Sequence, residues 1–149
     1  MHFFSLVFPK VADQHYTGHS IALWIFMLIA VLSTIRSLIH FLAPDGGAGT
    51  IARLDLSQGG RNIIFSFALW GLSQFIYAFL QLLVAFRFQN LIPLFYLILI
   101  FEITGRMVIG RLKPPVLLRG RPPGGYANFI LLPITIIMFI LSTQVSHPV

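Results

Sequence analysis

Four long apolar segments, separated by short polar stretches, dominate the hydrophobic pattern of the chain. The segments are residues 19–42, 62–86, 91–112 and 126–145. Each offers the roughly 20 mainly apolar residues that an α-helix needs to cross the hydrocarbon core of a bilayer. The pattern therefore predicts an all-α integral membrane protein, built as a bundle of four transmembrane helices.

The second segment, 62–86, separates polar from apolar side chains when it is drawn as a helix with about 100° per residue. The polar face consists of Asn62, Ser66, Trp70, Ser73, Gln74, Tyr77 and Gln81. Amide and hydroxyl groups in hydrocarbon need hydrogen-bond partners, so we expect this face to pack against protein. Gly71, Ala78 and Ala85 lie beside it at heptad spacing, and they predict the close approach of another helix.

The third segment carries an acidic residue, Glu102, inside an apolar run, with Arg106 one turn later. This spacing puts both side chains on one helix face, where they can pair. The connection at 87–90 is short enough to make the second and third segments antiparallel neighbours. Both helices rise by the same amount per residue, so residues equally far along the chain from that turn lie at the same depth. The polar face of the second segment therefore lies level with Glu102 and Arg106. The expected intramembrane polar cluster is Glu102, Arg106, Ser73, Gln74, Tyr77 and Gln81.

This charged pair has two interpretations. A charge inside a membrane is costly and is a functional hypothesis by default. Alternatively, Glu102 and Arg106 neutralise each other and fix the register of a helical hairpin. The structural interpretation is favoured, because Arg106 lies only about one turn from the basic loop that follows.

The inner half of the first segment also has a polar face, formed by Ser33, Arg36, Ser37 and His40. The favoured interpretation is that Arg36 snorkels to lipid headgroups while the hydroxyls bond to their own helix. The alternative is that this face turns inward, toward Arg106.

Basic residues are distributed unevenly between the two ends of the predicted helices. Lys10 and Arg87 lie at one end, and the other end has Arg36, Arg53, Arg61, Arg106, Arg111, Lys113, Arg119 and Arg121. The positive-inside rule then puts the loops 43–61 and 113–125 in the cytoplasm and both termini outside. This predicts a multi-pass protein of a plasma membrane or bacterial inner membrane.

Composition supports the membrane class, because only 9% of the 149 residues are charged, against about 25% in soluble domains. We expect a single membrane domain, 1–149. The net charge of +6 predicts contact with anionic lipids rather than nucleic acid, because the basic residues lie at membrane edges. The candidates for anionic-lipid or partner binding are Arg36, Arg53, Arg61, Arg111, Lys113, Arg119 and Arg121. The alternative is that they only set the orientation.

The N-terminal residues 1–10 contain an apolar run that is too short to span a bilayer. We expect it to lie on the outer surface, with Phe3, Phe4 and Phe8 among the headgroups. His15 and His19 then occur four residues apart, which is a recurrent metal-ligand spacing that Asp13 or His2 would have to complete. They are weak candidates, because no third ligand is fixed by spacing, and we expect neither a metal nor a cofactor.

Enzyme motifs are missing. Cysteine is absent, no HExxH pattern occurs, and the glycine-rich stretch 46–49 lacks the Gly-Lys-Ser/Thr ending of a phosphate loop. We therefore expect a non-catalytic interaction or accessory subunit, self-associating or held in a membrane complex, with anionic lipid on its cytoplasmic side. The alternative is an oligomeric channel or transporter that passes protons, ions or small solutes at Glu102 and Arg106.

Overall fold

The computed structural model describes residues 2–120 and 122–145. Within these residues the chain forms helices, and an isolated β-bridge joins the loop 43–59 to the loop 113–122. The helices are α1 (His2–Val7), α2 (Ser20–Leu42), α3 (Gly60–Arg87), the 3₁₀ helix η1 (Gln89–Leu91), α4 (Ile92–Leu112) and α5 (Pro123–Thr143).

Four of these helices, α2, α3, α4 and α5, are long and apolar enough to cross a membrane, as the hydrophobic pattern predicted. Their bounds follow the expected segments closely. The largest difference is at α5, which begins at Pro123 instead of residue 126. A proline is tolerated in the first helical turn because its missing N–H would have no partner there, so the helix extends into a stretch that looks like a loop in sequence.

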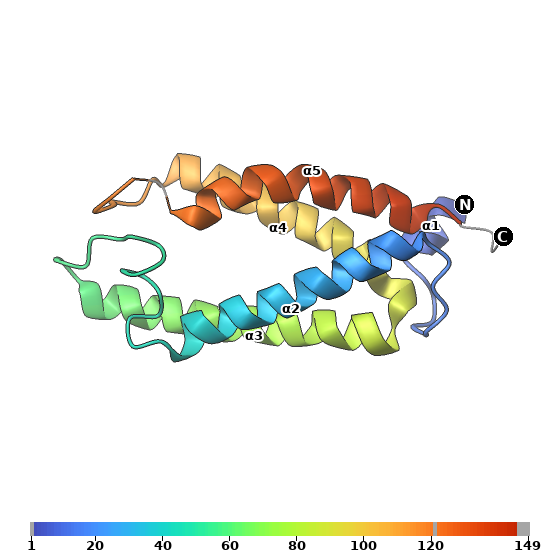
Figure 1. Ribbon diagram of the computed structural model, residues 1–149, viewed down its shortest axis with the longest axis horizontal. Helices are drawn as coiled ribbons and strands as arrows, with labels where there is room; N and C mark the ends of the chain where they lie inside the picture. The colour runs from blue at the N-terminus through green and yellow to red at the C-terminus, as the bar shows by residue number, and fades with distance from the viewer. Residues whose placement is uncertain (1, 121, 146–149) are drawn as a thin grey trace.

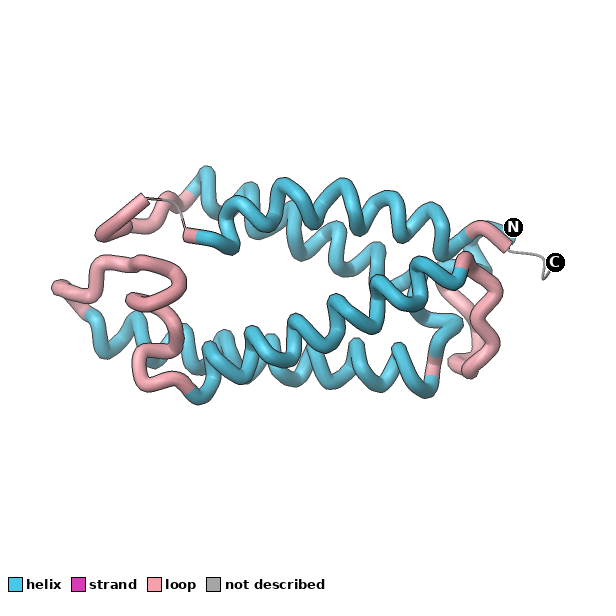
Figure 2. Tube along the Cα trace, in the orientation of Figure 1, coloured by secondary structure: helices cyan, strands magenta, loops and turns pink. Residues whose placement is uncertain are grey.

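The four long helices form two antiparallel hairpins, α2 with α3 and α4 with α5 (Figure 1). Residues 43–59 connect the first pair, residues 113–122 connect the second, and η1 joins α3 to α4. The hairpins meet where η1 lies and diverge toward the opposite end, which carries the loops 43–59 and 113–122 (Figure 2). These two ends are named the turn end and the loop end below.

The prediction that the second and third segments are close neighbours is wrong over most of their length. The helices α3 and α4 are antiparallel, but they contact each other near η1 and then separate (Figure 1). The most extensive partner of α3 is α2. The reason is that α3 turns its smallest residues toward α2, which makes the closest packing available there.

The row of small residues on α3 forms this interface, as its spacing predicted. Gly71, Ala78 and Ala85 are all buried. A Cβ atom at Gly71 would lie 2.6 Å from backbone atoms of His40 and Phe41, so the last turn of α2 passes directly over this glycine. Only a residue without a side chain allows this approach.

A hydrophobic core lies at the turn end and joins the two hairpins. Phe26 of α2 packs edge-on against Tyr96 of α4, with 5.5 Å between ring centroids, and both side chains are fully buried. The hydroxyl of Tyr96 donates a hydrogen bond to the carbonyl oxygen of Ala22 (2.6 Å), which satisfies a polar atom that burial would otherwise penalise. Val84 and Ile92 complete the contact between α3 and α4.

The N-terminal segment is tied to the same end. The side-chain amide of Asn90 donates to the carbonyl of Val11 (2.8 Å), and its oxygen accepts from the backbone N–H of Asp13 (3.0 Å). In α1, Phe3 and Phe4 are exposed. Their position relative to a bilayer remains a prediction.

The loop 43–59, at the loop end, is organised around Asp45. The Asp45 carboxylate accepts hydrogen bonds from the backbone N–H groups of Thr50 (2.8 Å), Gly47 (2.8 Å) and Gly49 (3.2 Å). These bonds, with that of Thr50 strongest, hold the pKa of Asp45 below its usual value, because they favour the charged form. The buried ring of His40 closes the loop, with Nδ1 2.7 Å from the carbonyl oxygen of Gly46.

The loops 43–59 and 113–122 also contact each other, so the hairpins are joined at the loop end as well. Leu54 and Leu117 form an antiparallel bridge, and the N–H of Leu118 donates to the carbonyl of Arg53 (2.9 Å). Residues 53–55 of the first loop are thus pairing partners for residues 116–118 of the second.

Substitution of Gly71 tests the close approach of α2 and α3. We expect Gly71→Ala to lower the free energy of unfolding by about 1–3 kcal/mol, because the new methyl group meets the α2 backbone, which cannot move independently. The matched control is Gly105→Ala in α4, where a Cβ meets nothing within 4 Å and the helix gains up to about 1 kcal/mol. Thermal melting in detergent measures both, and equal melting temperatures for the two variants would contradict the packing.

Candidate functional site

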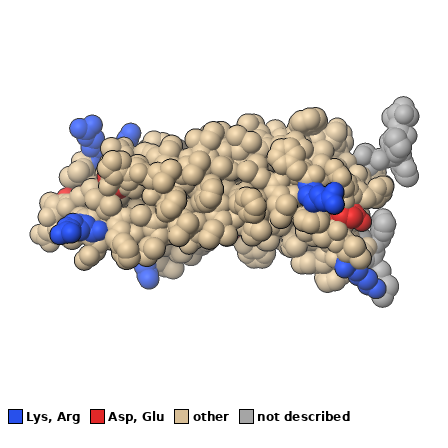
Figure 3. Space-filling model, turned by 90° about the horizontal axis from the view of Figure 1, so that it is seen from below, with Lys and Arg blue, Asp and Glu red and all other residues tan. Residues whose placement is uncertain are grey.

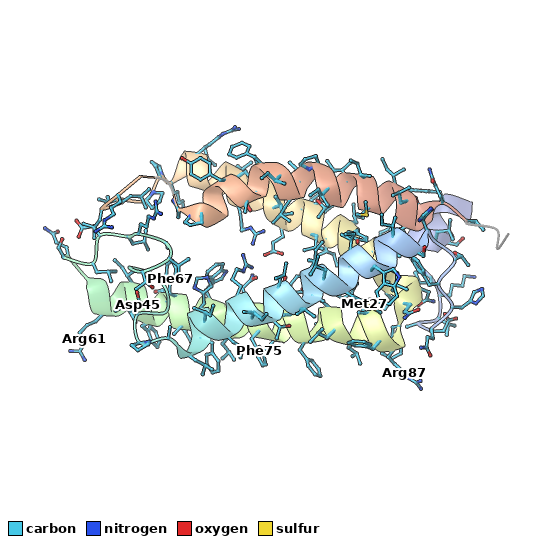
Figure 4. All side chains as sticks on the ribbon, in the orientation of Figure 1. Met27, Asp45, Arg61, Phe67, Phe75 and Arg87 are labelled. Atoms are coloured by element: carbon cyan, nitrogen blue, oxygen red, sulfur yellow. The ribbon has the colours of Figure 1, made fainter. Side chains whose placement is uncertain are left out.

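Charged and amide side chains bridge the space between the two hairpins. Nη2 of Arg36 in α2 donates a hydrogen bond to Oε1 of Gln74 in α3 (2.9 Å). Nε2 of Gln74 donates to Oε1 of Glu102 in α4 (3.3 Å), and Nη1 of Arg106 donates to the same oxygen (3.1 Å). These four residues form a continuous network across three helices, here named the bridging network. Figure 4 shows side chains of both hairpins pointing into the space between them.

The local sequence places these groups. Gln74 lies three residues after Gly71, so it shares the helix face that packs closest to α2, within reach of Arg36. Glu102 and Arg106 are one turn apart on α4, and the shared depth of Gln74 and Glu102 follows from equal helical rise on both sides of η1. The expected contact between Gln74 and Glu102 is present even though their helices have separated.

Arg36 adopts the inward position. Its guanidinium binds Gln74, lies 5.8 Å from the ring centroid of Trp70, and is close enough to Arg106 and Glu102 to interact with both charges. The favoured interpretation, snorkelling of Arg36 to headgroups, is therefore wrong. A cation–π contact and an amide acceptor together replace the hydration that snorkelling would have supplied.

Ser73 does not belong to the network. Its side chain is exposed, and its hydroxyl donates to the carbonyl of Leu69 in its own helix (3.2 Å). Ser66 behaves in the same way, with its hydroxyl 2.9 Å from the carbonyl of Asn62. The prediction that the whole polar face packs against protein is wrong here, because a serine hydroxyl needs no second helix when a carbonyl one turn back accepts its hydrogen bond.

Tyr77 and Gln81 continue the polar face of α3 toward the turn end. The ring of Tyr77 stacks on Phe95, with 6.0 Å between centroids, and Gln81 is fully buried. Within the described residues, the Tyr77 hydroxyl and the amide atoms of Gln81 are buried and close enough to interact with each other, but no hydrogen bond of good geometry joins them to each other or to another group. In the same part of the chain, Nε of Arg36 and Nε of Arg106 are also buried without a hydrogen-bond partner among the described residues. Because buried polar atoms in proteins are normally paired, often by water, this region has a capacity for further polar contacts.

The bridging network has an excess of positive charge. It holds two guanidinium groups, those of Arg36 and Arg106, and one carboxylate, that of Glu102. Glu102 and Arg106 are 22% and 26% exposed as side chains, so they are only partly shielded from their surroundings. Chemically, the network can hold the hairpins together, and it can also attract an anion.

Most basic residues of the candidate lipid set lie at the loop end. Arg61, Arg111, Lys113 and Arg119 are exposed, and Arg53 is half-buried with Nη1 3.3 Å from the carbonyl of Gly120. Arg121 lies outside the described residues. Figure 3 shows Lys and Arg at the two ends of one face and none across its middle, and Figure 4 shows Arg61 and Arg87 pointing away from opposite ends of α3.

The two candidate metal-ligating histidines have structural contacts. Nδ1 of His19 accepts a hydrogen bond from the backbone N–H of Ile21 (3.3 Å) and so caps α2. The backbone N–H of His15 donates to Oδ1 of Asp13 (2.8 Å). The described residues contain no group of three metal-ligating side chains. The side chain of His2 lies outside the description.

Fold and site together define a chain of four apolar helices in two hairpins, with a charged network between them. No family model, curated protein or solved structure matches this chain. Its function therefore has to be inferred from the chemistry of its own residues.

The charge balance of the bridging network makes a specific prediction. Glu102→Gln leaves Arg36 and Arg106 without a carboxylate, and we expect it to lower the free energy of unfolding by about 1.5–3 kcal/mol. Arg106→Gln should cost less, because Arg36 then balances Glu102. The double variant Glu102→Gln/Arg106→Gln should recover most of the free energy of unfolding that Glu102→Gln loses, because the bridging network then has the same net charge as in the wild type.

Melting in detergent measures these differences, with Ser73→Ala as the control, at a position on α3 beside Gln74 but outside the network. A double variant as unstable as Glu102→Gln alone would contradict the proposed balance.

Proposed function

We propose that the protein is a multi-pass membrane protein that acts without catalysis, as a small interaction or accessory subunit. The observation that carries the proposal is that Glu102 accepts hydrogen bonds from Gln74 and Arg106, while Gln74 also accepts from Arg36. The charged groups of the apolar region thus bind one another and stabilise the bundle. That leaves the outer helix faces and the basic loop end as the surfaces available for interaction.

The outer faces support a lipid-embedded position. Large apolar side chains such as Phe65, Phe79 and Phe101 are 63%, 57% and 70% exposed. A soluble monomer rarely exposes apolar surface on this scale, whereas lipid or a partner helix covers it without cost. The partners we propose are membrane lipids together with a second copy of the chain or another membrane subunit.

The proposed orientation has the loop end in the cytoplasm and both termini outside. Arg53, Arg61, Arg111, Lys113 and Arg119 are all at the loop end, and this asymmetry is the feature that the positive-inside rule uses. The same residues would face the anionic lipids of a plasma membrane or bacterial inner membrane, and these attract basic segments.

A non-catalytic role fits the distribution of acidic residues. The chain has four, and three of them, Asp13, Asp45 and Asp55, lie in end loops. Asp45 and Asp55 are engaged by backbone N–H groups of their own loops. Glu102 therefore has no second carboxylate beside it with which to divide acid and base roles.

Passage of protons, ions or small solutes through an oligomer is the second candidate. The specific observation in its favour is that Tyr77 and Gln81 carry buried polar atoms without a hydrogen bond of good geometry, on the helix that bears Gln74. Water at these atoms would extend the polar region from the bridging network toward the turn end.

Orientation and insertion can be tested by labelling, because the chain contains no native cysteine. Val11→Cys and Ser57→Cys place single thiols at exposed positions of opposite ends. In intact cells, a membrane-impermeant maleimide should label Val11→Cys and should reach Ser57→Cys only after permeabilisation. Labelling of both sites before permeabilisation, or the reverse pattern, would contradict the proposed topology.

The role of Glu102 separates the two candidate functions. Under the interaction proposal, Glu102→Gln lowers the melting temperature, and wild-type proteoliposomes show no Glu102-dependent proton or ion flux. Native mass spectrometry of the extracted protein should then show a second copy or a stoichiometric partner subunit. If Glu102→Gln melts like the wild type but abolishes a measured flux, the transport function is correct instead.

A further inference from the structure

A pocket of about 300 Å³ lies at the loop end of the second hairpin. Its walls come from the C-terminal part of α4, the loop 113–122 and the first turns of α5. This volume is at the lower end of the range for small-molecule sites, so it accommodates a headgroup and the start of a chain rather than a whole lipid.

The lining of the pocket is amphipathic. Arg106, Arg111 and Asn128 supply two guanidinium groups and an amide. Met107, Leu117 and Phe129 supply apolar surface. Guanidinium groups match the oxygens of a phosphate with paired charge-assisted hydrogen bonds, and the amide N–H adds a further donor. The complementary ligand is therefore an anion attached to an apolar chain.

Arg106 connects the pocket to the bridging network. It lines the pocket while its Nη1 binds Glu102, and its Nε is buried without a partner. Because the network already has one more guanidinium than carboxylate, an anion in the pocket would compensate the excess charge rather than compete with it. The sequence could not indicate this, since Arg106 and Asn128 belong to different helices.

We infer that this pocket binds the phosphate of an anionic phospholipid with a small headgroup, with the first part of its acyl chain against Met107 and Phe129. The inference rests on the proposed membrane position, in which the loop end faces anionic headgroups. It goes beyond general attraction to that surface, because it assigns one site with defined donors.

Two substitutions change the pocket in different ways. Arg111→Gln removes a positive charge from an exposed side chain that is not part of the bridging network. Gly110→Leu introduces an apolar side chain at a pocket-lining position without changing charge, and a Cβ atom there meets nothing within 4 Å. The matched controls are Arg61→Gln, which removes the same charge elsewhere at the loop end, and Gly105→Leu, at another open α4 position.

The experiment measures binding of phosphatidic acid and phosphatidylglycerol to the purified full chain by native mass spectrometry and by thermal stabilisation in detergent. Phosphatidylcholine and inorganic phosphate are the comparison ligands. We expect the wild type to prefer the anionic lipids, with inorganic phosphate giving little stabilisation. Arg111→Gln should weaken binding by about tenfold or more, which corresponds to the loss of one good charge-assisted contact. Gly110→Leu should weaken binding by about as much, because its side chain takes up space in the pocket. Arg61→Gln and Gly105→Leu should change it far less.

Each other outcome has a distinct meaning. Equal losses for Arg111→Gln and Arg61→Gln, or full binding by Gly110→Leu, overturn the pocket while leaving diffuse lipid attraction intact. Stabilisation by inorganic phosphate equal to that by the lipids overturns the lipid assignment. A wild type that does not distinguish anionic lipid from phosphatidylcholine overturns both this inference and the lipid part of the proposed function. Melting of each variant without lipid verifies that it is folded.

Discussion

The side-chain amide of Gln74 is the contact on which the middle of the molecule depends. It accepts from Arg36 and donates to Glu102, so it joins a cation on α2 to an anion on α4. An amide can do both at once because it has a donor and an acceptor side, which neither a carboxylate nor an ammonium group has. The hairpins are otherwise joined at their ends, by the Phe26–Tyr96 core and by the loop bridge. Gln74 is thus the polar link that holds them together halfway.

This link requires the close packing beside it. Gly71 lets the end of α2 lie against α3, and that approach brings Arg36 within hydrogen-bond distance of Gln74. Packing and electrostatics are therefore coupled, because a larger residue at Gly71 would also move Arg36. The coupling continues to Arg106, which belongs both to the network and to the pocket at the loop end. An anion bound there and the carboxylate of Glu102 would share the same guanidinium.

Much of the fold was predictable because it follows from periodicity within single helices. The four apolar helices, the Glu102–Arg106 pair, its contact with Gln74 and the small-residue face at Gly71 all depend on spacing along the chain. The inward turn of Arg36 and the outward position of Ser73 were not predictable in this way. They depend on how far each helix is rotated and tilted against its neighbour, and a helical wheel contains neither quantity. The divergence of the hairpins, the Leu54–Leu117 bridge and the pocket around Asn128 depend on the same tertiary placement.

The most direct test of the central claim is a double-mutant cycle between Arg36 and Glu102, measured by unfolding in detergent. In the wild-type background, Arg36→Gln and Glu102→Gln should be coupled by about 0.5–3 kcal/mol, as expected for residues in one polar network. In a Gln74→Leu background the coupling should fall to a small part of that value, because the bridging amide is gone. Coupling that is unchanged by Gln74→Leu, or absent from the wild type, would contradict a structure held together through this side chain.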